Sequence, residues 1–191
     1  MRVAFTGKRP KDLAGYDHDK YLPLFNYLKE YVVTLYHAGY TEFITGGAQG
    51  FDQLVFWAVN SVKTKQQLPI RNIVYVPYQG QQKNWSVKGT FGQEEYNIML
   101  KRADEVYCNP NTAHMNYSDR FLARDRAMVN QADLVVGLYP TDEWRSPLCT
   151  GGTAYTMKYA AKKGKTIIRI GYNSELTEFS KNHIVIRKEN N

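Results

Sequence analysis

Short apolar runs alternate with longer segments of helical periodicity along most of this chain of 191 residues. Apolar positions spaced three or four residues apart indicate helices, and short runs rich in β-branched and aromatic residues indicate strands. Their alternation predicts a parallel sheet, because parallel neighbours need a crossover connection and a helix supplies it. We therefore predict a doubly wound α/β fold with a mainly parallel sheet and helices on both faces. No linker rich in Pro, Gly or Ser divides the pattern, so residues 1–191 are expected to form one domain.

The apolar runs give the expected order of elements. A glycine, Gly39, follows the first helical segment and is expected to cap its carboxyl end. The predicted strands cover residues 2–6, 41–45, 72–78, 105–109, 133–139, 165–170 and, at an edge, 183–188. The predicted helices cover residues 21–35, 50–65, 92–103, 117–132 and 151–164.

A Thr-Gly pair recurs in three turns, at Thr6-Gly7, Thr45-Gly46 and Thr150-Gly151. The last two continue into a second glycine and a helix, and the first continues into Lys8 and Arg9. Carboxyl ends of parallel strands lie on one edge of a sheet, so such turns can converge in space. Glycine lets the backbone approach a ligand, and the free N–H groups of a helix start favour phosphate. The pattern predicts an anionic ligand at this edge, whereas a single such turn would only connect strand to helix.

Two common nucleotide motifs are excluded. Residues 162–166 read Lys-Lys-Gly-Lys-Thr, but Tyr159 occupies the leading glycine position of a P-loop, and the segment runs from helix into strand. The turn at 46–50 is not GxGxxG, and no acidic residue ends the strand at 72–78 to hold a ribose. The lack of a GxGxxG turn and of this acidic residue argues against NAD-dependent hydride transfer.

The segment 119–133 carries several charges, among which Arg120 and Arg124 share a helix face and Arg126 does not. It is either a solvated surface helix or one that places arginines over the glycine turns to grip phosphate. Asp52 has two interpretations as well, since it can stabilise the first turn of its helix or accept hydrogen bonds from a ribose or base. Trp85 can stack on a base, or serve as a lid or dimer contact.

The net charge and the cysteine and histidine content indicate which ligands and which kinds of site to expect. The formal net charge of +7 favours anionic partners such as nucleotides, nucleic acid or phosphorylated metabolites. The two cysteines and four histidines have no metal-ligand spacing, so we expect neither a metal nor a cofactor. Cys149 has no neighbouring histidine in sequence and is not expected to be a nucleophile. Few cysteines, no secretory leader and no long apolar run predict a cytoplasmic protein without membrane contact.

As an ordered set, five stretches resemble the SLOG superfamily of Rossmann-like proteins, which includes the DNA-processing protein DprA and the cytokinin-activating LOG hydrolases. The likeness is strongest to the bacterial and phage proteins of YpsA/YoqJ type. The stretches are "FTGKRP" at 5–10, "ITGGAQGFD" at 44–52, "PYQGQQKNW" at 77–85, "FLARDRAM" at 121–128 and "TGGTAYTMKYA" at 150–160.

The resemblance implies a Rossmann-like fold with a nucleotide-type pocket and, by analogy, a homodimer. Asp125 stands where the arginine-pair motif usually has asparagine, which puts the backbone-supporting role of that position in doubt. The ligand-binding residues that the resemblance implies are Gly7, Lys8, Arg9, Thr45, Gly46, Gly47, Asp52, Gln81, Trp85, Arg124, Arg126, Gly151, Gly152 and Thr153.

One departure from the LOG hydrolases bears on activity. Those enzymes carry a glutamate shortly after the glycine-rich turn, and residues 151–160 contain no acidic residue. Cleavage of an N-glycosidic bond usually uses a carboxylate, so binding of a nucleotide or nucleotide-derived ligand, such as one like ADP-ribose, is favoured. Asp52 or Asp125 could replace the glutamate, which leaves a nucleoside monophosphate phosphoribohydrolase as an alternative. Single-stranded DNA binding of the DprA kind is a further alternative, permitted by the charge and the aromatic residues.

Overall fold

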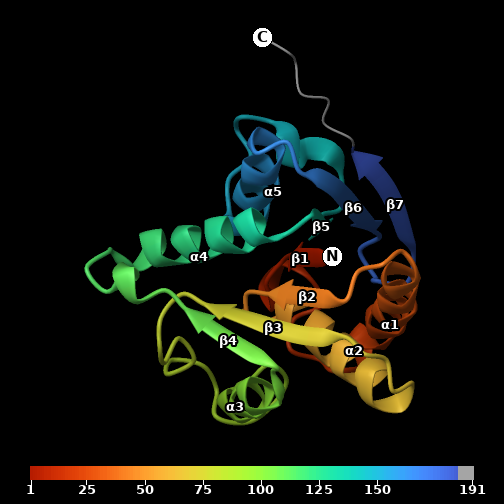
Figure 1. Ribbon diagram of the computed structural model, residues 1–191, viewed down its shortest axis with the longest axis horizontal. Coiled ribbons are helices and arrows are strands. Elements are labelled where there is room, and N and C mark those ends of the chain that lie inside the picture. Colours follow the sequence, from red (N-terminus) through yellow and green to blue (C-terminus); the bar gives the residue numbers. More distant parts are fainter. Residues whose placement is uncertain (185–191) are drawn as a thin grey trace.

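A seven-stranded sheet forms the centre of the structure, a computed structural model that describes residues 1–184 (Figure 1). The strand order is β4-β3-β2-β1-β5-β6-β7, and every neighbouring pair is parallel except β6 with β7. The strands are β1 (Arg2–Thr6), β2 (Glu42–Thr45), β3 (Arg71–Val76), β4 (Glu105–Cys108), β5 (Leu134–Leu138), β6 (Thr166–Tyr172) and β7 (Phe179–Ile184).

In the described part of the chain, five α-helices cover the sheet in two groups (Figure 1). The first three pack on one face, and the last two pack on the other. The helices are α1 (Leu22–His37), α2 (Phe51–Lys65), α3 (Gln93–Arg102), α4 (Tyr117–Gln131) and α5 (Gly152–Lys162). Within residues 1–184, each helix is too short or too polar to cross a bilayer.

Alternating side chains of the strands supply the two cores. In β1, Val3 and Phe5 pack with α1 and α2, whereas Ala4 packs with α4 and α5 on the opposite face. In β5, Gly137 lies against Met157 of α5, where an added Cβ would come within 2.8 Å of the terminal methyl carbon. A side chain on this strand position would therefore displace the Met157 side chain.

The structure confirms the predicted doubly wound, Rossmann-like α/β fold. Predicted and observed elements agree in order and differ by a few residues at their ends. Gly39 has φ +91° and lies just beyond α1, as expected for a carboxyl-terminal cap. The last strand begins at Phe179, earlier than the predicted 183–188, and 185–188 lie outside the described residues.

The strand order places a switch point beside β1. The chain fills the sheet from β1 outward to β4, then returns through α4 to β5 on the other side of β1. The turns that leave β1 and β5 consequently run to opposite faces, and the crevice between them is where open α/β sheets bind ligands.

Candidate ligand-binding site

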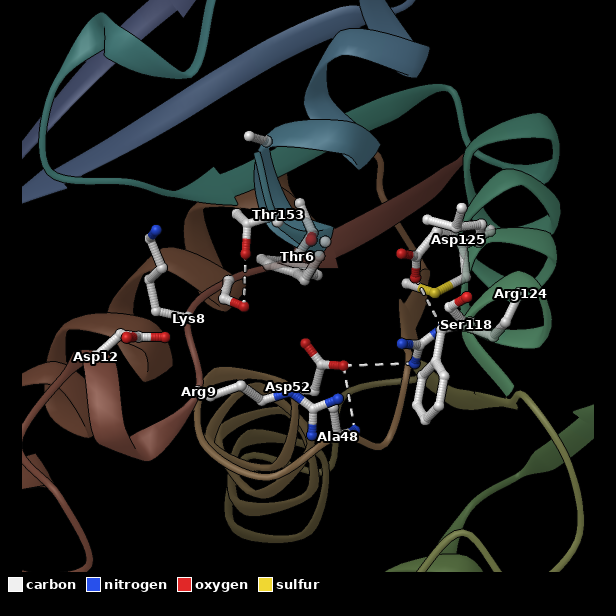
Figure 2. A pocket seen from close by; sticks show the side chains of 18 of the residues that line it. Thr6, Lys8, Arg9, Asp12, Ala48, Asp52, Ser118, Arg124, Asp125 and Thr153 are labelled. Atoms are coloured by element: carbon white, nitrogen blue, oxygen red, sulfur yellow. Dashed lines mark hydrogen bonds and ion pairs between the residues drawn. The ribbon is translucent and has the colours of Figure 1, made fainter. Parts of the chain in front are cut away.

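A pocket of about 430 Å³ opens at this switch point, a size common for small-molecule sites. Its walls come from the turn after β1, the turn between β2 and α2, one face of α4, and the start of α5 (Figure 2). Figure 2 shows Lys8 and Asp12 on one side of the space and Arg124 and Asp125 on the other.

Arg124 joins α4 to the turn after β2. Its side chain is 7% exposed, and its Nη1 donates a hydrogen bond to the carbonyl oxygen of Gly46. The same nitrogen lies 3.6 Å from Oδ2 of Asp52, and Nε lies 2.7 Å from Oδ1 of Asp125. A Cβ on Gly46 would overlap the guanidinium, so glycine at this position is what allows the arginine to cross the turn.

The two carboxyl groups beside Arg124 are almost completely buried. Burial raises the pKa of Asp52 above its ordinary value, and the guanidinium groups of Arg124 and Arg9 oppose that rise. Burial likewise raises the pKa of Asp125, opposed by Arg124 and by the Thr156 hydroxyl. Two buried carboxyls thus share one guanidinium, and this arrangement favours retention of a proton by a carboxyl.

The start of α5 forms the opposite wall and is fixed to the turn after β1. Oγ1 of Thr153 donates a hydrogen bond of 2.8 Å to the carbonyl oxygen of Gly7 (Figure 2). Gly151 precedes the helix with φ +101°, a conformation that residues with a Cβ rarely adopt. The first-turn N–H groups of a helix lack intrahelical acceptors, so this exposed end offers donors to an anion.

Lys8 and Arg9 add positive charge to the pocket wall. Nζ of Lys8 lies 4.1 Å from the ring centre of Tyr139, and Cζ of Arg9 lies 5.9 Å from that of Phe121. Within residues 1–184 neither side chain forms an ion pair with a carboxylate. Their charges are therefore available to a ligand.

The structure brings together most residues that the sequence suggested. Thr45, Gly46 and Gly47 are buried in the turn behind the pocket and do not line it. The suggested residues that line the pocket are Gly7, Lys8, Arg9, Asp52, Arg124, Gly151, Gly152 and Thr153.

Three further suggested residues, Gln81, Trp85 and Arg126, also lie outside the pocket lining. Gln81 is buried, and its Nε2 donates to Tyr96 Oη at 2.7 Å and to the Gly47 carbonyl at 3.3 Å, so it supports the turn from behind. Trp85 packs edge-on against Tyr96, with ring centres 5.1 Å apart. Arg126 follows Arg124 by two residues, and this spacing directs the two side chains to different sides of α4.

Sequence reasoning missed the aromatic residues of the pocket. Tyr117 and Phe121 line it, together with Ser118 and Asp12. The signal was present, because Tyr117 and Phe121 lie four residues apart on the helix face that also carries Arg124.

The groups that line the pocket are of the kinds that bind anions. Across residues 1–184, no three side chains of His, Cys, Asp or Glu are grouped as a metal site. The donors of the pocket are instead guanidinium, ammonium, hydroxyl and backbone N–H groups, which suit an oxyanion such as phosphate.

Comparison with known proteins identifies a relative and a family. The chain is 29% identical over 130 residues to the uncharacterized SPbeta prophage-derived protein YoqJ of Bacillus subtilis (strain 168). That alignment covers 63% of this chain and 70% of the relative. The YpsA family model, described as the YspA SLOG family, matches residues 3–174, which include every wall of the pocket. The chain therefore belongs to the YspA SLOG family.

Proposed function

We propose that this protein binds a nucleotide or nucleotide-derived ligand, such as one like ADP-ribose, in the pocket at the switch point. The observation that carries the proposal is that the open start of α5 lines the same pocket as Lys8 and Arg9, whose side chains form no ion pair within the described chain. A phosphate group would accept hydrogen bonds from the first-turn N–H groups and would be attracted by both cations. Membership of the SLOG family also supports a nucleotide-related ligand, without specifying which one.

The pocket wall that contains Asp52 and Asp125 suits the sugar of such a ligand. The carboxyls of Asp52 and Asp125 line the pocket beside Arg124. Carboxylate oxygens accept hydrogen bonds from vicinal hydroxyls, and a protonated carboxyl donates one as well. The two walls together favour a phosphorylated sugar over a simple anion.

Thermal unfolding with a panel of AMP, ADP-ribose, ribose 5-phosphate and inorganic phosphate tests this proposal. A ligand at 100 times its Kd should raise the free energy of unfolding by ~2.7 kcal/mol, which corresponds to a Tm increase of about 5–10 °C for a chain of this size. The Lys8→Ala variant should lose most of the shift, because it removes a pocket cation. Lys11→Ala is the matched control, since Lys11 is exposed and does not line the pocket. An unchanged Tm with every ligand would refute the proposal.

A second candidate function is hydrolysis of a nucleoside monophosphate, favoured by two pocket carboxyls with raised pKa. A protonated carboxyl would donate its proton to the base nitrogen as the N-glycosidic bond breaks. Water would add to C1′ of the oxocarbenium-like centre and give its proton to the second carboxyl, yielding free base and ribose 5-phosphate. In this mechanism, Asp52 of α2 and Asp125 of α4 supply the carboxyl groups that residues 151–160 lack.

Chromatography of nucleoside monophosphates after incubation with the protein separates binding from hydrolysis. If hydrolysis occurs, Asp52→Asn or Asp125→Asn should reduce base release by at least about 100-fold, the usual contribution of a general acid or base. Both variants keep the side-chain shape, and binding measured in parallel shows whether the pocket is intact. Intact monophosphates after prolonged incubation with the unaltered protein would leave binding as the function and reject hydrolysis.

A further inference from the structure

An aromatic surface lies at the α4 side of the pocket. Tyr117 and Phe121 line the pocket one helical turn apart, with ring centres 5.1 Å apart and planes inclined by 62°. Tyr117 is 65% exposed, a large fraction for an aromatic ring beside a pocket. Exposed aromatic faces of this kind serve as stacking surfaces for planar rings.

A third ring holds this surface in place. Tyr78, from the segment after β3, has its ring centre 5.8 Å from that of Tyr117 and 6.0 Å from that of Phe121, where the planes meet at 90°. Arg120 lies over the Tyr78 ring at 5.5 Å. The three rings and the cation therefore form one packed cluster.

The backbone that carries Tyr117 is also fixed. Arg120 donates through Nε to the Met115 carbonyl at 3.0 Å and through Nη2 to the Ala113 carbonyl at 2.6 Å. Asn116 caps α4 by accepting a hydrogen bond of 2.9 Å from the N–H of Asp119. A ligand would thus meet a stacking surface that is already ordered, and the entropy cost of binding would be small.

Charge next to the rings favours an electron-rich planar group. Cζ of Arg9 and Cζ of Arg124 each lie 5.9 Å from the centre of the Phe121 ring. Guanidinium groups attract aromatic faces, so the two cations lie over Phe121, and the more exposed ring of Tyr117 supplies the open stacking face. The phosphate-binding end, at Lys8 and the start of α5, is formed by other segments of the chain.

We infer that the pocket recognises the base of its ligand by stacking on Tyr117, beside Phe121, while the phosphate binds at Lys8 and the start of α5. This inference rests on the proposed function and narrows it to ligands that carry a planar base. A bare sugar phosphate, which fills only the charged end, binds more weakly.

Calorimetric titration with AMP and with ribose 5-phosphate tests the inference, because AMP carries adenine at C1′ where ribose 5-phosphate carries a hydroxyl. Stacking of one base predicts that AMP binds about 5- to 150-fold more tightly. Tyr117→Ala should remove most of this preference by weakening the binding of AMP, and Tyr117→Phe should retain the preference. Tyr107→Ala is the control, since Tyr107 is a partly exposed tyrosine on β4 that does not line the pocket.

The outcomes separate this inference from the proposed function. Equal affinities for AMP and ribose 5-phosphate would overturn base stacking and leave phosphate-ligand binding standing. A preference for AMP that survives both Tyr117→Ala and Phe121→Leu would also overturn it, because the base would then bind elsewhere. Failure of AMP, ribose 5-phosphate and ADP-ribose alike would overturn both proposals.

Discussion

The Arg124→Ala variant is expected to lose about 3–5 kcal/mol of unfolding free energy at neutral pH, the usual cost of removing one partner from a buried ion pair. Arg124 is 7% exposed, and its guanidinium contacts Asp52, Asp125 and the Gly46 carbonyl. Its removal leaves two buried carboxyls without a nearby cation on α4. Urea unfolding monitored by circular dichroism measures the loss.

The penalty should depend on pH in a defined direction. Burial raises the pKa of Asp52 and of Asp125 above the ordinary 3.8, so the folded chain binds these protons more tightly than the unfolded chain. Their contribution to stability is complete below pH 3.8 and is lost as the pH rises through the folded pKa. Arg124 limits this loss by stabilising the carboxylates. The destabilisation caused by Arg124→Ala should therefore be larger at pH 7 than at pH 5.

Arg126→Ala is the matched control for this prediction. Arg126 lies two residues further along α4, outside the pocket lining, and within residues 1–184 it forms no ion pair. We expect its removal to change the unfolding free energy by no more than about 0.5 kcal/mol. Equal penalties for both variants, or a penalty for Arg124→Ala that does not vary with pH, would contradict the role assigned to the buried guanidinium.

The Gly46→Ala variant is expected to lose about 1–3 kcal/mol of unfolding free energy, as other overpacked sites do, and to lose ligand binding. An added Cβ would overlap the Arg124 guanidinium and lie 2.7 Å from Oδ2 of Asp52. The arginine would have to leave the turn, which separates it from the Gly46 carbonyl and disturbs the pocket wall. Urea unfolding and the AMP thermal shift measure the two effects.

Gly152→Ala separates steric overlap from the general effect of adding a methyl group. At Gly152 the nearest atom to an added Cβ is Oδ2 of Asp125, at 3.8 Å, an ordinary contact distance. Because the residue is the first of α5, alanine should leave stability unchanged or raise it by about 0.5–1 kcal/mol. A Gly46→Ala protein as stable as Gly152→Ala would show that the turn accommodates a side chain, contrary to the structure.

The sequence predicted the fold well because its local signals and its tertiary arrangement agree. The buried strand β5 reads as an apolar run, and α1 has its apolar residues on one face and a glycine at its end. The antiparallel strand β7 was placed too late, because Phe179 and Ser180 lack the apolar run that identified His183 and the residues after it. Pairing with β6, a tertiary effect, extends the strand to Phe179.

The sequence predicted that the glycine turns converge at one edge of the sheet. It predicted less well which side chains line the candidate pocket. The turns converge because the carboxyl ends of parallel strands must meet at one edge. Trp85 was expected near the ligand, but its ring packs against Tyr96, and Tyr117 lines the pocket instead. Which aromatic residue faces the pocket depends on how α4 is rotated and on where the segment 77–92 folds, and local patterns determine neither.

The two hydrogen bonds to carbonyl oxygens of the turns have a kinetic consequence. Thr153 holds the turn after β1 from α5, and Arg124 holds the turn after β2 from α4. Both turns are thus restrained by helices from the same face of the sheet, independently of any ligand. Binding that needs no loop closure proceeds at the rate of encounter, and differences in affinity among related ligands then arise in their dissociation rates.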